Sequence, residues 1–511
     1  MSSQFQLPPD DSASETPCRS CVCRIVLSLL IALSAALPAA LAGSPQIVGW
    51  GHNYYGQATP PSQATNLPRN VPTTAIGYGE AAKLLEQLDG PVAPASWQGG
   101  LSNPKWADFG GTPFTYHMGG TPKTQAHMKL DIDYGIKPMW NINVMIPGKV
   151  HPEQVVVIGA HRDGWAYGTN DSTSGFIVVM EIARSLKQLM DQGWQPDRSI
   201  ILAGWDGEEY GLLGSTEWVE QFAQQLGKDC VGYINLDGAG GGQYFGAAGV
   251  PALDQLLYDV TKRVEEPRTP GKSVYEDWAT RGARIGRMGG GSDYQSFLQY
   301  VGVPSISMGF GGTSGGNYHS STDDLYFMDN WGDPGYKHYA AMARLAGITA
   351  LRLANADVLP FVYSKYAGEV VGYLDQLKAK YPQYDLNFDR ERAQATAWQT
   401  AALSMEGQID ALLTAGSAIP PKLAGKVNFI NAKLISMERD LTQEKGVPDR
   451  TWYKHMIYTP GMYTGYAVQY LAPLEDSIAA EEWAKVNNYQ ALLHNSLVKA
   501  TNTAKTAATA K

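Results

Sequence analysis

Four short apolar runs, separated by stretches with a helical pattern, dominate the middle of this chain. The runs are Val155–Gly159, Ser199–Ala203, Val231–Leu236 and Pro304–Met308. Buried strands that alternate with helices are typical of a mainly parallel sheet with helices on both faces. The stretch Phe176–Met190, apolar nearly all round at its start, is predicted as one of these helices. The pattern therefore predicts an α/β fold: a mixed, mainly parallel sheet sandwiched by helices.

The length of 511 residues allows several domains around this sheet. Residues 43–72 are rich in Gly, Pro, Asn and Thr without an apolar period, so we expect a loop-rich lead-in there. Residues 73–130 are expected to form a small mixed module that contains a helix over Glu80–Leu88. The α/β domain is expected over residues 131–354.

Beyond residue 355 the apolar pattern becomes that of amphipathic helices, which predicts a separate helical domain over residues 355–500. The tail, residues 501–511, lacks bulky apolar side chains and is predicted to be disordered. The expected helices are Tyr363–Tyr381, Arg390–Ala415, Asn428–Gln443 and Glu475–Ala500.

The N-terminus has the layout of a secretory signal. Arg19 and Arg24 precede the apolar stretch Ile25–Ala42, which ends in small residues. We expect a signal peptide over residues 1–42, and a secreted, periplasmic or extracellular protein, with a retained membrane anchor as the alternative. The other cysteines lie in this leader, so only Cys230 would remain and no internal disulfide is expected.

The charge balance excludes one class of partner. The chain has 40 Lys and Arg against 49 Asp and Glu, with no long basic run. A mildly negative protein of this kind is not expected to bind nucleic acid.

Acidic residues and histidines follow the predicted strands. In an open α/β sheet, ligands bind where the parallel strands end. A single Asp or His at such a place is usually a cap or a loop anchor, but several on successive connections indicate a shared site. Imidazoles and carboxylates without thiolate suit zinc or a similar ion in an open, hydrolytic site. The residues are His161, Asp163, Asp171, Glu208, Glu209, Asp237 and His319.

These motifs resemble the metallopeptidase family that includes glutamate carboxypeptidase II and the non-enzymatic transferrin receptor. The resemblance runs from about Val71 to Ala500 and implies the zinc-dependent exopeptidase fold. It also implies a partial protease-associated module (73–130), a zinc peptidase domain (131–354) and a dimerisation-like helical domain (355–500). The motifs that carry it are Gly159–Gly164, Trp205–Trp218, Tyr233–Asp237 and Tyr318–His319.

The resemblance implies a role for each candidate residue in a di-zinc exopeptidase that hydrolyses terminal peptide bonds of small peptides. Asp171 would bridge two zinc ions, and Glu208 would be the general base for the bridging water. Tyr318 could donate to the oxyanion. His161 and Asp237 would complete one zinc site, and Glu209 and His319 the other.

Two further expectations concern supporting residues. Asp163 follows His161 at a spacing that suits a carboxylate hydrogen-bonded to the imidazole, which would orient that ring toward the metal. The alternative is a turn-forming Asp before a glycine. Glu217 and Glu220 lie one helical turn apart, and the resemblance implies a structural calcium there. The alternative for this pair is a solvated acidic helix face.

The chain also departs from the family. The N-terminal half of the protease-associated module and the segment before it have no counterpart, so we expect a shortened member. The lysine that glutamate-selective relatives place before a tyrosine is Gly465 here, next to Tyr466. Their strand-end arginines correspond to Ser307 and Gly309. We therefore expect neutral peptides to be cleaved better than acidic ones, in a pocket lined by Tyr466, Ser292 and the apolar Met308 and Phe310.

The sequence leaves other functions open. The same fold could act as an aminopeptidase or a carboxypeptidase, and a receptor-like homologue could lack catalysis altogether. The run Gly312–Gly316 fits a serine-nucleophile pattern with Ser314, but no helical period follows it. The helical domain resembles the part through which relatives dimerise, so a homodimer is expected.

Overall fold

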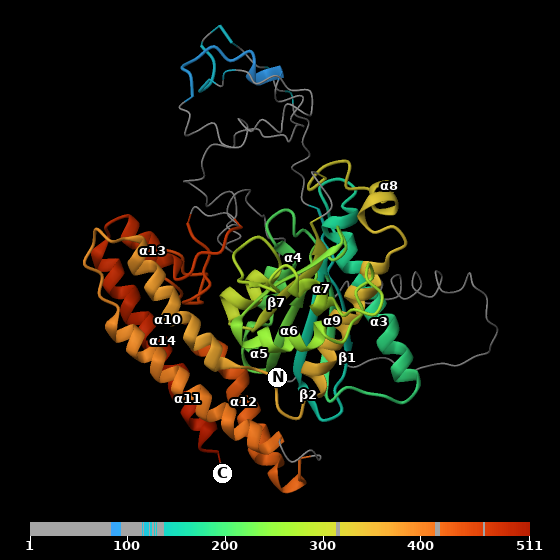
Figure 1. Cartoon of the computed structure of the whole chain (residues 1–511), viewed down its shortest axis with the longest axis vertical. Helices are drawn as coiled ribbons and strands as arrows, with labels where there is room; N and C mark the ends of the chain where they lie inside the picture. The colour runs from blue at the N-terminus through green and yellow to red at the C-terminus, as the bar shows by residue number, and fades with distance from the viewer. Residues whose placement is uncertain are drawn as a thin grey trace, which may run out of the picture. The chain divides into compact units, whose positions relative to one another are not determined.

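The computed structural model describes two stretches of the chain in different detail (Figure 1). Residues 141–312, 317–413, 419–462 and 466–510 are described nearly continuously. Before them, the described residues are 83–93, 115, 117–121, 123–124, 127, 129 and 137–140. The predicted leader and lead-in, together with Ser314, lie outside the described residues. Within the described part, no helix has the length and apolar character needed to cross a membrane.

The chain divides into two compact units, Met1–Ile47 with Pro60–Lys137, and Val48–Thr59 with Pro138–Lys511. In the first unit, residues 83–85 are helical, within the predicted helix Glu80–Leu88. Val92 and His117 form an antiparallel bridge. The Asp89 carboxylate accepts hydrogen bonds from the Thr121 amide at 2.6 Å and the Thr124 hydroxyl at 2.6 Å. These contacts hold the described part of the first unit together.

The second unit is built on a seven-stranded sheet with the order β1-β3-β2-β4-β7-β5-β6. Strands β2, β3, β4 and β7 run parallel, whereas β1 and β5 are antiparallel to their neighbours β3 and β7. The sheet is therefore mixed and mainly parallel, as predicted. Its strands are β1 (Ile142–Ile146), β2 (His151–His161), β3 (Arg198–Trp205), β4 (Cys230–Asn235), β5 (Tyr244–Gly249), β6 (Ile285–Gly286) and β7 (Ser305–Gly311).

Strand order explains why helices cover both faces. Because β2 lies between β3 and β4, the connection from β2 to β3 and the connection from β3 to β4 cross the sheet in opposite directions. Right-handed crossovers then place their helices on opposite faces. Figure 1 shows α3 and α9 on one side of the strands and α4 and α5 on the other. These helices are α3 (Gly175–Asp191), α4 (Leu213–Gln221), α5 (Ala223–Asp229) and α9 (Lys337–Asn355).

Shorter elements complete the α/β part of the unit. They include the π-helical turn η6 (Thr169–Ser174), which precedes α3, and η8 (Ser296–Val301), which precedes β7. The others are η7 (Pro251–Leu253), α6 (Asp254–Thr261), α7 (Val274–Ala279), α8 (Leu325–Phe327) and η9 (Met328–Gly332).

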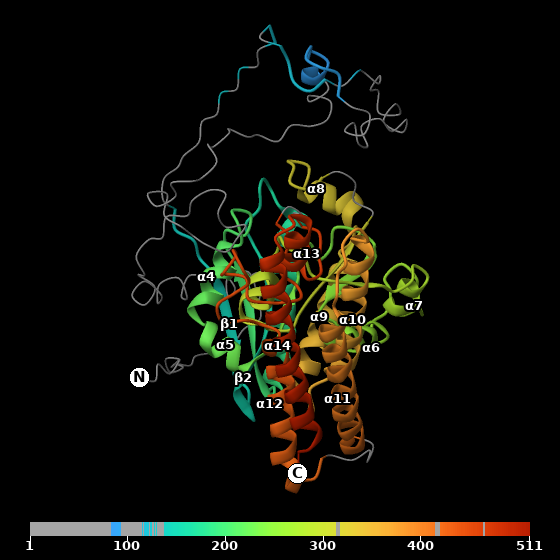
Figure 2. The ribbon, with the colours of Figure 1, turned by 90° about the vertical axis from the view of Figure 1, so that its left-hand side faces the viewer.

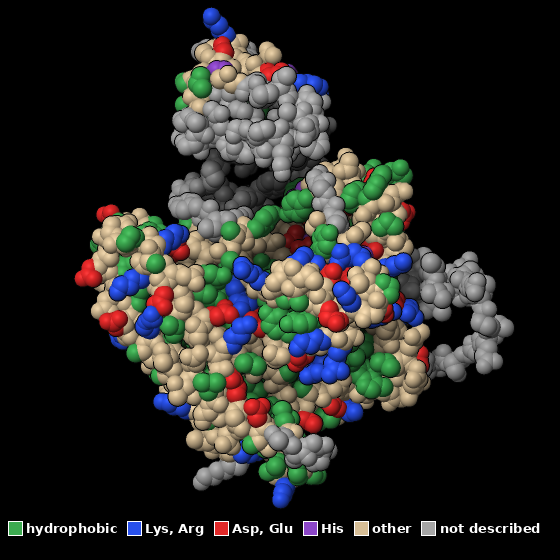
Figure 3. Space-filling model, viewed as in Figure 1, with side chains coloured by type: hydrophobic (Ala, Val, Ile, Leu, Met, Phe, Trp, Pro, Cys, Tyr) green, Lys and Arg blue, Asp and Glu red, His purple; other side chains and the backbone are tan. Residues whose placement is uncertain are grey.

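The C-terminal helices pack along one another in Figure 2. They are α10 (Tyr363–Lys380), α11 (Asp389–Leu413), η10 (Pro421–Leu423), α12 (Ala424–Asp440), α13 (Ala472–Ala479) and α14 (Trp483–Ala508). Arg439 of α12 joins this bundle to the α/β part, because its guanidinium donates to the carbonyls of Leu226 and Gly227, each at 3.2 Å. On the face in Figure 3, basic side chains are interspersed with acidic ones.

Two predictions about the C-terminus are wrong. The expected helix Glu475–Ala500 is broken between α13 and α14, where Glu481 adopts a positive φ of 57°. The expected disordered tail is helical as far as Ala508. Ala500, Ala504 and Ala507 repeat at helical spacing and are almost completely buried, so small side chains suffice to pack this end of α14.

Candidate metal centre

The predicted ligands lie at one edge of the sheet because parallel strands end there together. His161 is the last residue of β2, and Glu208 and Glu209 follow the end of β3. Asp237 comes two residues after β4. This edge is the expected place for a ligand site in an open α/β sheet.

Asp171 reaches the same edge through a close contact. It lies in η6, and the helix that follows begins at Gly175. A Cβ on Gly175 would be 1.8 Å from the Leu236 carbonyl oxygen, so only glycine lets the start of α3 approach the end of β4 this closely. The Ser172 hydroxyl donates to the His161 carbonyl at 3.0 Å. The turn that carries Asp171 is thus held between β2 and β4.

His319 arrives from the loop after β7. Its backbone has a positive φ of 55°, a conformation that few non-glycine residues adopt. The Tyr318 ring stacks on its imidazole with the centroids 3.6 Å apart. The Nε2 atom of His319 lies 3.0 Å from Asp171 Oδ2 and 3.3 Å from Glu209 Oε2.

The two oxygens of Asp171 face two different groups of ligands. While Oδ2 faces His319 and Glu209, Oδ1 lies 3.2 Å from His161 Nε2. That same nitrogen lies 3.3 Å from Asp237 Oδ1. The structure therefore brings all five predicted ligands together, with one carboxylate between two pairs.

The spacing of these atoms fits cations better than direct hydrogen bonds. A charge-assisted N–H···O bond is about 2.7–2.9 Å long, shorter than the separations of 3.2 and 3.3 Å around His161 Nε2. Corners of a tetrahedron with arms of about 2.0 Å lie about 3.3 Å apart, which is the ligand spacing of zinc. Among the described residues, His161 Nε2 and Glu209 Oε1 are buried without a hydrogen-bond partner. The donor set and its unpartnered atoms thus fit zinc.

Burial and the closeness of several carboxylates shift the pKa values of these side chains. Burial raises the pKa of Glu208 well above its usual range, although His161 opposes the shift. Burial and the nearby carboxylate of Asp171 raise the pKa of Glu209 to about 8. Burial lowers the pKa of His161, but the adjacent carboxylates of Asp163 and Asp171 outweigh it and the pKa is raised well above its usual value. Divalent cations would supply positive charge beside these carboxylates.

Asp163 supports the site in two ways. Its backbone carbonyl lies 3.1 Å from His161 Nδ1, and its carboxylate Oδ1 lies 3.4 Å from the same nitrogen. The carboxylate also accepts the amide of Glu208 at 3.1 Å and the amide of Glu209 at 3.2 Å. Asp163 therefore contacts the imidazole, as expected, and it also fixes the backbone that carries the two glutamates. The sequence did not suggest this second contact.

The structure buries Ser292 and Met308, two residues that were expected in the substrate pocket. The Ser292 hydroxyl donates to Asp237 Oδ2 at 2.7 Å and accepts from Asn235 at 2.9 Å, so it orients a predicted ligand. Met308 is 3% exposed and belongs to the core. The alternation of β7 turns Met308 to the other face from Gly309 and Gly311. Phe310, which was also expected in the pocket lining, is among the residues around a hollow that includes these two glycines.

Tyr318 and Tyr466 lie at the mouth of the site, with 58% and 60% of their surfaces exposed. Their hydroxyl oxygens are 3.1 Å apart. The Tyr466 ring packs against Gly291, where a Cβ would be 2.1 Å from the ring. A segment of the C-terminal region thereby reaches the loop that carries His319.

Sequence reasoning missed two buried acids at this site. Asp293 is completely buried, and burial raises its pKa to about 7. Asp323 accepts the amides of Asn170 and Asp171. Neither acid follows a predicted strand or has a distinctive spacing, and only the fold brings them to the ligands.

The predicted calcium pair lies on α4. Glu220 Oε1 accepts from the Trp452 indole at 2.5 Å. Burial and the charge of Glu220 raise the pKa of Glu217, so the two carboxylates affect each other. Burial raises the pKa of Glu220, and the charge of Lys454 partly opposes this shift. The described residues thus place a lysine charge close to this pair.

Comparisons with known proteins divide the chain in the same way. Residues 141–342 match the model of peptidase family M28, and residues 386–505 match that of the transferrin receptor-like dimerisation domain. A probable glutamate carboxypeptidase, LAMP1 from Arabidopsis thaliana, is 38% identical over 66% of this chain and 49% of its own length. Aminopeptidase NAALADL1 from Rattus norvegicus is 30% identical over 81% of this chain and 58% of its own length.

The chain thus spans about half the length of these relatives. A solved zinc aminopeptidase from Bacillus subtilis is 21% identical, with a TM-score of 0.33 over 42% of this chain and 50% of that one, a likeness too low to support an inference. The assignment rests on the two family models and the curated relatives. The chain combines a peptidase family M28 domain with a transferrin receptor-like dimerisation domain, the two parts that the sequence resemblance implies.

Proposed function

We propose that the protein is a di-zinc exopeptidase that hydrolyses terminal peptide bonds of small peptides. The observation that carries the proposal is the position of Asp171, whose two oxygens face two separate pairs of nitrogen and oxygen donors. His161 and Asp237 would hold one zinc ion with Asp171, and Glu209 and His319 would hold the other. When bound, such ions lower the pKa of a water between them and neutralise negative charge on the carbonyl oxygen.

Glu208 is the residue suited to proton transfer. It is 8% exposed, and its Oε2 lies 3.8 Å from His161 Nε2, outside the two ligand pairs but beside them. Asp163 fixes its backbone amide, so the side chain starts from a defined position. In this arrangement Glu208 takes a proton from the attacking water and passes it to the leaving amine.

Tyr318 is suited to donate a hydrogen bond to the carbonyl oxygen. Burial and the hydrogen bond with Tyr466 raise the pKa of its hydroxyl well above the usual value, so the proton stays on the oxygen. Its ring stacks on His319, which supports a role for this side chain beside the metal centre. A donor fixed at the place where negative charge develops lowers the barrier.

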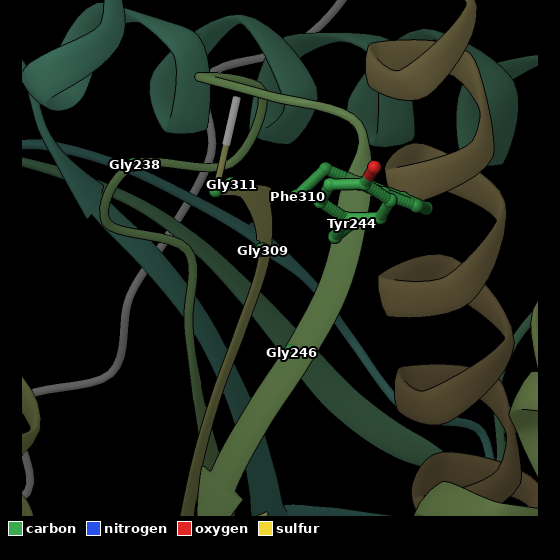
Figure 4. A pocket seen from close by; sticks show the side chains of 7 residues that line it. Gly238, Tyr244, Gly246, Gly309, Phe310 and Gly311 are labelled. Atoms are coloured by element: carbon green, nitrogen blue, oxygen red, sulfur yellow. The ribbon is translucent and has the colours of Figure 1, made fainter. Parts of the chain in front are cut away.

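A glycine-lined hollow supports selectivity for neutral side chains. Figure 4 shows Gly246 of β5 and Gly309 of β7 below Tyr244. The hollow has a volume of about 380 Å³ and includes Gly238, the residue after Asp237. The described residues that line it are five glycines, Tyr244 and Phe310, and none of these is charged. Arg268 and Arg281 lie over the Tyr244 ring, and the charges of both are paired with Asp277.

Hydrolysis of dipeptides and tripeptides with added zinc tests the activity, with Glu208→Gln as the comparison. Cleavage by the native protein and its loss in the variant would support the proposal, and equal rates would remove Glu208 as the base. Peptides blocked at either terminus decide between aminopeptidase and carboxypeptidase action. Faster turnover of a glutamate-containing dipeptide than of its leucine counterpart would contradict the neutral preference.

The remaining expectations are proposals with separate tests. The transferrin receptor-like dimerisation domain suggests a homodimer, which light scattering of the purified protein would measure. A structural calcium at Glu217 and Glu220 is tested by elemental analysis of the native protein and of Glu217→Gln. Export through the leader of residues 1–42 is tested by N-terminal sequencing of protein from the producing cells.

A further inference from the structure

One acidic residue of the His319 loop holds the loop that carries Asp171. Asp323, 2% exposed, accepts the amide of Asn170 at its Oδ1, 2.8 Å away, and the amide of Asp171 at its Oδ2, 3.0 Å away. Its backbone carbonyl accepts the amide of Thr169 at 3.2 Å. Three consecutive amides of one loop therefore bind a single residue of the other.

Asp323 is in turn fixed relative to His319. Its amide donates to the Ser320 carbonyl at 3.1 Å. The Ser320 amide and hydroxyl both donate to the Asn317 carbonyl, at 3.1 and 2.8 Å. His319 lies inside this closed turn. A short chain of hydrogen bonds thus connects the backbone of His319 to that of Asp171.

The other ligand pair is fixed by different contacts. His161 ends a central strand, and its Nδ1 lies 3.1 Å from the Asp163 carbonyl. Asp237 is held by the Ser292 hydroxyl at 2.7 Å. Loss of the Asp323 contacts would therefore disturb the His319 side of the centre more than the His161 side.

We propose that Asp323 is a positioning residue that sets the spacing of Asp171 and His319 and so determines the affinity of the cation held by Asp171, Glu209 and His319. Both of its carboxylate oxygens accept backbone amides, so it acts through the ligands and not on the cation. The inference rests on the proposed di-zinc centre. Loss of a residue that orients metal ligands lowers metal affinity by about 10- to 100-fold.

The test is calorimetric titration of the metal-free, full-length protein with zinc. Asp323→Asn removes the charge and replaces one acceptor with a donor. Asp324→Asn is the matched control, because Asp324 caps α8 by accepting from the Phe327 amide at 2.7 Å and asparagine caps equally well. His319→Ala identifies which of the two binding events belongs to the His319 side.

We expect the event lost in His319→Ala to weaken about 10- to 100-fold in Asp323→Asn, with the other event nearly unchanged and Asp324→Asn like the native protein. Native affinity for both ions in Asp323→Asn, or equal weakening of both events, would overturn the inference. If Asp323→Asn does not fold, Asp323→Glu, which keeps the charge but displaces the carboxylate, must show the selective weakening. A native protein that binds no zinc would instead refute the proposed function itself.

Discussion

Replacing Gly246 by leucine would fill the hollow beside Asp237 without disturbing the fold. A Cβ at Gly246 meets no atom within 4 Å, and its φ is not positive, so a side chain can project into the hollow without strain. Complete burial of a Leu or Phe side chain contributes about 1.5–3 kcal/mol. Because the hollow is open on one side, we take half of this, about 0.8–1.5 kcal/mol, as the contribution of a substrate side chain that lies there.

Gly246→Leu should therefore lower kcat/KM for a dipeptide with Leu or Phe in the hollow by about 4- to 13-fold. The same reasoning gives about 0.4 kcal/mol for an alanine side chain, a loss of about twofold. Gly286→Leu is the control, since Gly286 lies on the neighbouring strand β6 and an added Cβ there makes only ordinary contacts at 3.5 Å. Equal losses on alanine and phenylalanine substrates, or no loss on either, would refute the reasoning.

Three other predictions follow from the contacts of the site and of the domain junction. Glu208→Gln should lower kcat by about 10²- to 10⁴-fold while zinc content, measured by elemental analysis, stays native. Tyr318→Phe should lower kcat by about 10²- to 10³-fold with little change in KM, and an unchanged kcat would exclude it as a donor. Arg287 bridges the buried Asp254, at 2.8 Å, and Glu369 of α10, so Arg287→Met should lower the free energy of unfolding in urea by about 3–5 kcal/mol. Burial would raise the pKa of Glu369, but the hydrogen bond to Arg287 outweighs it and the pKa is lowered from 4.5. The stabilisation by this ion pair is therefore complete above pH 4.5 and is lost as the pH falls through the lowered pKa. Unfolding of Arg287→Met measured against pH should not show this loss.

The buried strands were predictable because they are covered on both faces. The interiors of β2, β3 and β4 are continuous apolar runs, which is how such strands are recognised. The edge strand β1 has exposed residues, and β5 and β6 are short and rich in glycine, so none of the three was predicted. The helix break near Glu481 depends on one residue with positive φ, which no apolar period reveals.

The ligands were predictable from their position at strand ends, but their supporting contacts were not. Asp163 holds two amides of the connection after β3, and Asp323 holds two amides of the turn before α3. These contacts join segments far apart in the chain, so local spacing carries no signal for them. The burial of Met308 is a different case, because the alternation of β7 already places it opposite Gly309.

Anomalous diffraction from zinc-loaded crystals would show whether two ions share Asp171. We expect two peaks about 3.5–4 Å apart, with Asp171 in contact with both ions. One peak should lie between His161 and Asp237, and the other between Glu209 and His319. A single peak, or ions that do not contact Asp171, would contradict the proposed di-zinc centre.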